Sequence, residues 1–186
     1  ASGINRSLAK PIFSSSDSDA SLQAKKIAEF ISYQTRKSSD VSTKFDTDLK
    51  SLSEQCHSKE FESKLELLGK YLAASSKRYD NNGDGPDVVW VFEEEHIAFA
   101  FEAKNEKLPD NPLTKQEHGQ LQVAKEWLRA QYPKMKCFAI SVHPNNMAYK
   151  NASAESALVL TLNKLNELVK SIGQLIAILS CGTLNE

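Results

Sequence analysis

Acidic and basic side chains flank two neighbouring apolar segments, and their types suit metal binding and proton transfer. Residues 88–92 and 97–101 are rich in β-branched and aromatic side chains, which predicts two buried strands. The polar residues 93–96 between them predict an exposed hairpin tip. Asp87 precedes the first strand, and the triplet Glu102-Ala103-Lys104 follows the second. We therefore expect two carboxylates and an ammonium group to lie on neighbouring strands.

The alternation of side chains along a strand places Glu102 and Lys104 on one face, and Phe101 and Ala103 on the other. An unpaired charge on a buried strand costs roughly 3 to 5 kcal/mol. A compensating group is therefore needed, and a divalent cation would supply it. The alternative is that Asp87 is only a turn residue after a Gly-Pro pair, and that the Glu-x-Lys end of the strand runs into solvent.

A helix is predicted over residues 57–76, where apolar side chains recur at helical spacing. Glu62 and Glu66 lie on one flank of its apolar stripe, so either could add a third carboxylate to the acidic cluster. Gly69 on the same flank would allow the helix to approach the strands closely. For each glutamate a solvated helix face remains the alternative.

A second helix is predicted to begin after Thr114, which serves as its N-cap. Glu117, three residues later, completes a capping box. Lys115 lies in the first turn of this helix. Gln120 comes directly before the apolar stripe, from where it could reach the strand ends.

The remaining segments complete an α/β pattern with a helical N-terminal part. We divide the chain into an N-terminal helical extension with a linker over residues 1–56 and a second domain over residues 57–186. The N-terminal part could brace the core, contact DNA or dock another domain. The remaining predicted elements are a linker at 14–19, helices at 21–36 and 41–55, strands at 137–142 and 157–162, and a closing helix with apolar residues from 165 to 179.

The order of these motifs resembles the PD-(D/E)xK nuclease superfamily, whose fold is also called restriction-endonuclease-like. A helix with glutamate, Gly-Pro-Asp, Glu-x-Lys, and a helix with Lys-x-Glu-x-x-Gln follow one another between residues 59 and 179. In detail the motifs are most similar to nuclease domains that lie beside helicase modules in bacterial proteins. The resemblance implies an α/β core with a mixed four-stranded sheet flanked by helices.

The resemblance also implies the roles of the site residues. Asp87 and Glu102 would be the metal ligands, with Glu62 as the helical carboxylate that assists them. Lys104 would hold or activate the attacking water and stabilise charge on the phosphorus. Gln120 would orient the water or touch the substrate backbone. Oxygen ligands of this kind suit Mg²⁺, for which Mn²⁺ can substitute.

The implied activity is that of a metal-dependent phosphodiesterase that cleaves nucleic acid. We expect a DNA endonuclease in bacterial or phage genome processing or defence, with a fused or associated helicase domain as a partner. RNA cleavage remains an alternative, and so does a catalytically silent module that binds nucleic acid or a partner protein. Lys107 and Lys115 could line a phosphate track with Lys104, and the polar loop 107–112 is a candidate for substrate contacts.

The composition sets limits on these expectations. With 186 residues, of which 40% are hydrophobic and 25% charged, the chain can bury a sizeable core. A net charge of −1 argues against tight autonomous binding to duplex DNA. The three cysteines have no metal-ligand spacing, which predicts free thiols in a reducing compartment, the cytoplasm. The sequence has no apolar run long enough to span a bilayer and no glycine-rich phosphate loop.

Two further patterns are set aside. Residues 80–85 match the first half of a calcium-binding loop, but the twelfth position is Val91 instead of a bidentate glutamate. A turn that leads into the first strand is the better interpretation. The four histidines are scattered without metal-ligand spacing, and we interpret them as surface or structural residues, with His118 near enough to Gln120 to meet substrate.

Overall fold

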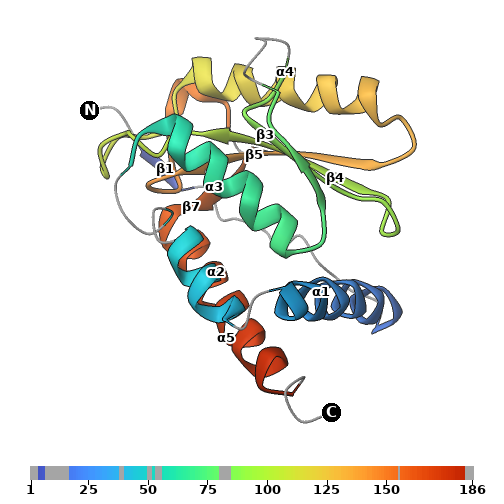
Figure 1. The fold of residues 1–186 in the computed structure, drawn as a ribbon. Helices are drawn as coiled ribbons and strands as arrows, with labels where there is room; N and C mark the ends of the chain where they lie inside the picture. The colour runs from blue at the N-terminus through green and yellow to red at the C-terminus, as the bar shows by residue number, and fades with distance from the viewer. Residues whose placement is uncertain are drawn as a thin grey trace.

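A mixed five-stranded sheet carries the fold of the part of the chain that the structure describes (Figure 1). The structure is a computed structural model, and it describes residues 4–6, 17–37, 40–49, 52, 56–79, 85–154 and 156–182. The strands of this sheet, in spatial order, are β2 (Ser75–Lys77), β3 (Val88–Phe92), β4 (Ile97–Ala103), β5 (Lys136–His143) and β7 (Leu158–Thr161). A separate pair consists of β1 (Ile4–Arg6) and β6 (Met147–Tyr149). The helices are α1 (Asp17–Lys37), α2 (Val41–Leu49), α3 (Ser58–Tyr71), α4 (Lys115–Gln131) and α5 (Leu162–Gly182), with a short 3₁₀ turn at Lys150–Ala152.

The middle strand, β4, joins an antiparallel half of the sheet to a parallel half. It pairs with β3 as a hairpin, and with β5 in parallel after the crossover through α4. A parallel pair needs such a crossover, because the chain must return to the end of the sheet at which the first strand began before the second strand can run in the same direction. The carboxyl end of β4 therefore lies beside the carboxyl end of β5 and the beginning of β3.

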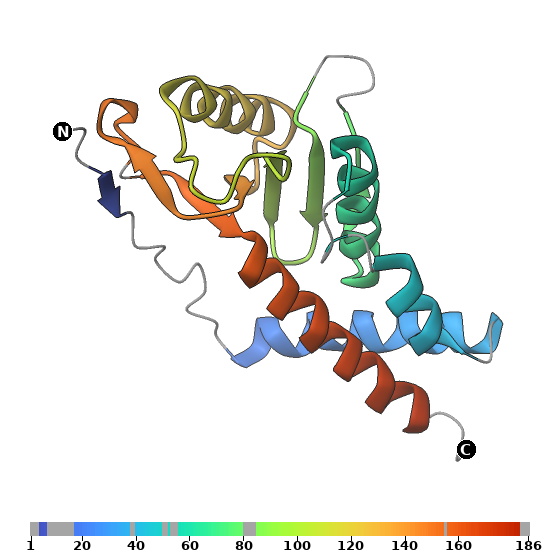
Figure 2. The ribbon, with the colours of Figure 1, turned by 90° about the vertical axis from the view of Figure 1, so that its left-hand side faces the viewer.

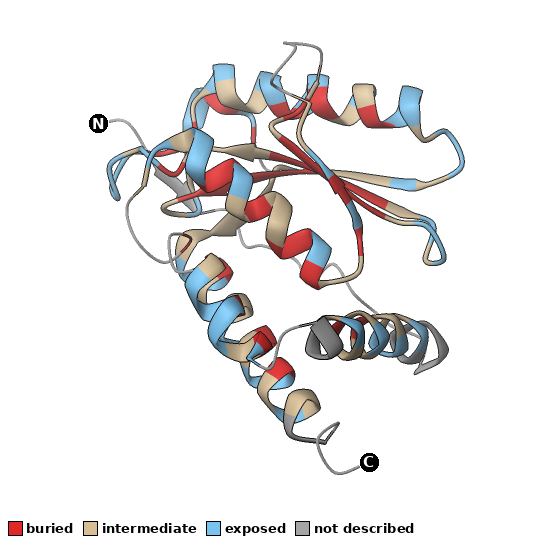
Figure 3. Ribbon diagram, viewed as in Figure 1, coloured by how far each residue is buried: buried red, intermediate tan, exposed pale blue. Residues whose placement is uncertain are grey.

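Helices cover both faces of the sheet, and the alternation of side chains decides which residues each face presents. Val89, Ala98 and Ala139 face α4, where they pack against Leu121 and Leu128. The opposite face carries the larger side chains of the same strands, including Trp90, Phe99 and Phe101, and packs against α3 and α5. Figure 3 shows the buried residues in the middle of the sheet and along the inner sides of α3 and α4.

Helix α3 lies very close to β3, as Gly69 in the sequence predicts. A Cβ atom at Gly69 would lie 2.4 Å from Nε1 of Trp90. The same indole nitrogen donates a hydrogen bond to the Leu65 carbonyl at 3.1 Å, so the ring is fixed against the helix. The absence of a side chain at this position sets the distance between α3 and the sheet.

The N-terminal helices brace α5. Ile31 of α1 and Phe45 of α2 are buried in the same core as Ile172 and Ile176 of α5. Figure 2 shows α1 crossing α5, with α2 beside the same helix. The position of Gly173 on α5 allows the Phe45 ring to approach to 3.3 Å from where a Cβ would stand. Of the roles predicted for the N-terminal part, this packing corresponds to the bracing one.

Three sequence-based expectations about elements are corrected. The sheet has five strands and not four, because β2 pairs with β3 at its edge. The helix expected over residues 57–76 ends at Tyr71, because the turn at Leu72 and Ala73, with a left-handed Ala73 at φ 57°, redirects the chain into β2. Within the linker expected at 14–19, residues 17–19 belong to α1, and residues 14–16 lie outside the described part.

Other expectations agree with the structure or lie beyond what it describes. Strand β3 has the predicted bounds, and residues 93–96 form the predicted turn. Cys56 and Cys137 are free thiols, whereas the side chain of Cys181 and residues 80–84 are outside the described part. The predicted helix at 41–55 is described as helix to Leu49. Among the described helices, none combines the length and the apolar character needed to cross a bilayer.

Candidate active site

Asp87 stands at the entrance to β3 and is tied to the end of β4. Its Oδ2 accepts a hydrogen bond from the backbone N–H of Ala103 at 2.7 Å. In the strand register Val88 lies opposite Phe101, so Asp87 is next to Glu102 across the hairpin. Asp87 has the same parity as Val89 and Val91, whose side chains face α4. Its carboxylate is therefore held by the backbone of the neighbouring strand, on the α4 face.

Glu102 and Lys104 share that face at the carboxyl end of β4. The side chain of Glu102 is 12% exposed and that of Lys104 is 19% exposed, and the two charged groups are 3.7 Å apart. The Lys104 N–H donates to the Val142 carbonyl at 2.8 Å, which extends the parallel pairing with β5 by one residue. The predicted sharing of one face by the acid and the base agrees with this geometry.

The electrostatics of Glu102 are those of a crowded, buried carboxylate. Burial, and then the neighbouring charge of Asp87, raise its pKa to about 7 against the opposite effect of Lys104. Glu62 contributes a smaller upward effect. Two acids that repel each other away from water favour a proton or a cation between them. A proton on Glu102 relieves this repulsion at neutral pH, and a cation would relieve it in the same way.

Glu62 lies on α3, and an arginine compensates its charge. Its side chain is buried, and Arg78 donates from Nη2 to Glu62 Oε2 at 2.7 Å. The sequence left open whether Glu62 or Glu66 approaches the acidic cluster. Glu66 pairs with Lys70 one turn further along α3, whereas Glu62 is the one whose charge acts on Glu102. Of the two helical glutamates, Glu62 is therefore the one whose charge raises the pKa of Glu102. Its own charge is compensated by Arg78.

The remaining predicted site residues lie on α4 and on the loop before it. Gln120 and Lys115 are exposed near the beginning of α4, and the structure gives neither a contact with the acidic pair. Lys107 is mostly buried and donates from Nζ to both carboxylate oxygens of Glu117, at 2.9 and 2.8 Å. Its ammonium group therefore holds the loop to the helix, while Lys115 stays open to solvent.

The loop 107–112 is braced from both sides. Thr114 and Glu117 form the predicted capping box, with Glu117 N–H to Thr114 Oγ1 at 3.2 Å and Thr114 N–H to Glu117 Oε2 at 2.8 Å. From the other side, Asn145 donates through Nδ2 to the Pro109 and Asn111 carbonyls at 2.6 and 3.0 Å. These contacts tie the loop to α4 on one side and to the segment after β5 on the other.

Three residues at the site had no role in the sequence-based prediction. Arg78 follows the short strand β2, and it pairs with Glu62. Ser141 and His143 are almost wholly buried on β5, at the register positions opposite and just beyond Glu102. Burial lowers the pKa of His143, and Lys107 adds to the effect. The alternation of the predicted strand 137–142 was the signal that could have placed Ser141 on the face of Glu102.

The fit of the site to a divalent cation depends on how many carboxylates converge there. Among the described residues, no group of three or more His, Cys, Asp or Glu side chains converges in the arrangement of a metal site. Asp87 and Glu102 nevertheless supply two carboxylates on one face, and the pKa of Glu102 is raised first by burial and then by the charge of Asp87. Mg²⁺ is commonly held by one or two carboxylates, with waters and substrate phosphate as its other ligands. The pair fits such an ion, and Glu62 would need to leave Arg78 to join it.

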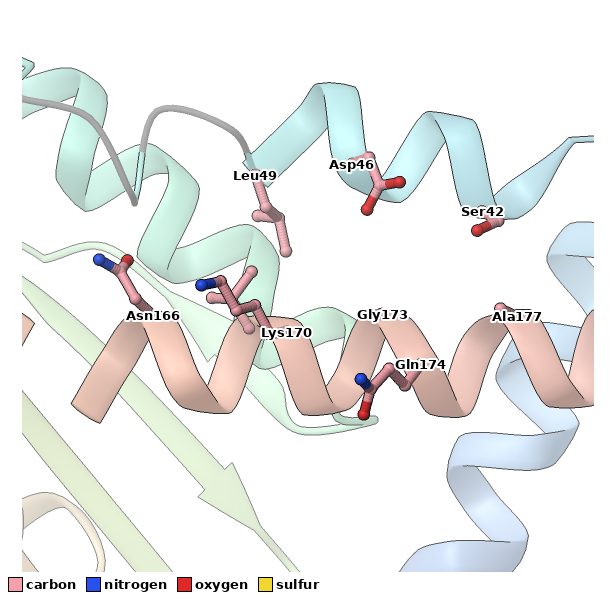
Figure 4. A pocket seen from close by; sticks show the side chains of 9 residues that line it. Ser42, Asp46, Leu49, Asn166, Lys170, Gly173, Gln174 and Ala177 are labelled. Carbon is pink, nitrogen blue, oxygen red and sulfur yellow. The ribbon is translucent and has the colours of Figure 1, made fainter. Parts of the chain in front are cut away.

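A pocket of about 500 Å³ lies elsewhere, between α2 and α5 (Figure 4). Asp46 from α2 and Asn166, Lys170 and Gln174 from α5 supply polar groups to its lining. It shares no residue with the acidic pair on β3 and β4, and none of the motifs found in the sequence contributes to it. The end of β4 therefore remains the candidate site.

Compared with protein-family models, with curated proteins and with solved structures, the chain has no match.

Proposed function

We propose that the protein is a metal-dependent phosphodiesterase that cleaves nucleic acid as an endonuclease, with DNA as its substrate. The observation that supports this proposal is the meeting of Asp87, Glu102 and Lys104 on one face at the end of the middle strand. Two partly buried acids and an ammonium group at 3.7 Å from one of them are the residue types that this hydrolysis requires. The likeness of the motifs to PD-(D/E)xK nucleases suggested the same activity.

Each side chain has a task that follows from its place. Asp87 and Glu102 would hold Mg²⁺ or Mn²⁺, which lowers the pKa of a bound water and neutralises phosphate charge. Lys104 is mostly buried and adjacent to Glu102, so its ammonium can hold a water for attack or stabilise charge that develops on the phosphate. Gln120 and Lys115 are exposed on the first turns of α4, where they are accessible to a substrate backbone.

A second candidate function is a module that binds nucleic acid or a partner protein without cleaving. One observation favours it: the carboxylate of Glu62 is paired with Arg78, which leaves two acids where the motif would supply three. The two proposals differ in what they expect of Lys104. A nuclease needs this ammonium for turnover, whereas a binding module needs it at most for affinity.

The deciding experiment is a cleavage assay on circular single-stranded DNA, supercoiled duplex DNA and structured RNA, each with Mg²⁺, Mn²⁺ or EDTA. The test variants are Asp87→Asn and Lys104→Met, which keep the approximate shape of each side chain. Glu126→Gln serves as the control. Among the contacts described, this exposed carboxylate on α4 pairs only with Arg129, one turn further along the same helix.

We expect metal-dependent cutting of circular DNA by the wild type and by Glu126→Gln, and none by the other two variants. Cutting of RNA alone would replace DNA as the substrate. If the folded wild type cuts no substrate with either metal yet binds nucleic acid, the binding module is the correct function. Full activity in Lys104→Met would refute the assignment of the site.

A further inference from the structure

Two serine hydroxyls are buried in the sheet without a hydrogen-bond partner among the described residues. Ser76 lies on β2 and is 6% exposed, and Ser141 lies on β5 and is 1% exposed. A buried hydroxyl that makes no hydrogen bond destabilises the folded chain, so such groups usually have a partner or a function. The two serines differ in their neighbours, and this difference shows which of them has a function at the site.

Ser141 lies directly opposite Glu102 in the parallel pairing of β4 with β5. Parallel neighbours in register present their side chains on the same face of the sheet. The face is that of α4, because Ala100, two residues before Glu102, and Ala139, two residues before Ser141, both pack in the core beneath that helix. The hydroxyl is thus next to the carboxylate whose charge the site must control.

The contact described for Glu102 is with the charged Lys104 and with no neutral donor. Lys104 reaches Glu102 Oε2 at 3.7 Å, a distance at which the charges attract but the contact is not a close hydrogen bond. The Ala103 N–H is used by Asp87. Ser141 is a hydroxyl donor on the adjacent strand, and it has no hydrogen-bond partner in the described part of the chain.

We propose that Ser141 is a positioning residue for the metal centre: its hydroxyl donates a hydrogen bond to the Glu102 carboxylate when that carboxylate is ionised and holds a divalent cation. The proposal rests on the proposed function, since it assumes a cation at Glu102. A donor that hydrogen-bonds to a metal-binding carboxylate fixes the orientation of the carboxylate and restricts its rotation. This role accounts for a polar side chain at a buried position of an otherwise apolar strand.

Ser76 provides a matched control within the same sheet. It is paired in register with Trp90, on the face that packs against α3, and its Oγ lies 2.7 Å from the place of a Cβ at Gly69. It therefore lies beside an indole ring and a helix, and it is the register partner of neither Asp87 nor Glu102. Ser76→Ala and Ser141→Ala remove the same atom from comparable burial, and only the second removes it from beside Glu102.

The test measures Mn²⁺ binding by isothermal titration calorimetry, together with thermal unfolding of the metal-free proteins in EDTA. We expect Ser141→Ala to keep the unfolding midpoint of the wild type or to raise it, because an unpaired hydroxyl is lost. We expect its dissociation constant for Mn²⁺ to rise about tenfold, as is typical when a residue behind a metal ligand is removed. Ser76→Ala should leave the dissociation constant unchanged.

Ser141→Cys covers the case in which the alanine variant does not fold, because it keeps the volume and replaces the hydroxyl by a weak donor. We expect the same weakening of Mn²⁺ binding from it. Wild-type affinity in a folded Ser141 variant would overturn the positioning role while leaving the proposed function intact. Equal weakening in Ser76→Ala would also overturn it, since the effect would then be a general loosening of the sheet. A wild type that binds no Mn²⁺ would overturn the metal site itself, and the positioning role with it.

Discussion

Replacing Glu102 by glutamine should stabilise the metal-free protein at alkaline pH. Burial and Asp87 raise the pKa of Glu102 from 4.5 to about 7. The unfolded chain therefore loses this proton near pH 4.5, while the folded chain keeps it until about pH 7. Between these values the folded state binds more protons than the unfolded state, so the free energy of unfolding falls as the pH rises. The stability that protonated Glu102 contributes to the folded state is fully lost above pH 7.

The size of the effect follows from the same shift. Each pH unit between the two pKa values is worth about 1.4 kcal/mol, so the raised pKa lowers the free energy of unfolding by about 3 kcal/mol at pH 8 and about 1 kcal/mol at pH 5. Glutamine has the shape of the protonated acid and carries no charge. Glu102→Gln should therefore be more stable than the wild type by about these amounts at the two pH values.

The assay is urea unfolding in EDTA at pH 5 and pH 8, followed by tryptophan fluorescence. Trp90 is 4% exposed against α3 and reports on the core of the sheet. The exposed Glu126→Gln variant is the control, and its stability should differ little from that of the wild type at both pH values. A Glu102→Gln protein that is less stable than the wild type at pH 8, or equally changed at both pH values, would refute the electrostatic account of the site.

Three further predictions concern the site and its supports. Asp87→Asn and Lys104→Met should each abolish cleavage while circular dichroism shows a folded protein, and residual full turnover in either would contradict the proposed roles. Gly69→Ala should lower the free energy of unfolding by about 1 to 3 kcal/mol, because the new Cβ would lie 2.4 Å from Trp90 Nε1; unchanged stability in urea would show that α3 can shift freely. Burial raises the pKa of Glu117, but hydrogen bonds from Lys107 and Thr114 outweigh it and hold the pKa below its usual range, so Glu117→Gln should cost about 1 kcal/mol at neutral pH and less as the pH falls below 4, as pH-dependent unfolding would show.

The elements around the candidate site could be predicted because their signals are local. Strand β3 and the hairpin turn follow from two apolar runs separated by four polar residues, and the capping box at Thr114 from a spacing of three. The shared face of Glu102 and Lys104 follows from alternation alone. These features depend on residues close together in the sequence, where the periodicity is strong.

The features that could not be predicted depend on pairing between distant or atypical segments. Strand β2 is three polar residues long, so it has no apolar alternation, and only its pairing with β3 makes it a strand. The partner of Glu62 is Arg78, which joins a helix to the chain beyond that short strand. Ser141 stands within an apolar run, where its type is visible but the register that places it opposite Glu102 is not.

The hairpin formed by β3 and β4 also bears on the order in which the chain folds. Its two strands are joined by one short turn, so Asp87 and Glu102 meet through a local contact that closes on the microsecond scale. Strand β5 joins only after the chain has travelled through α4, which is a slower, less local event. The two acids are therefore brought together while water still surrounds them, and their repulsion becomes costly only in the later step, when the crossover closes over them.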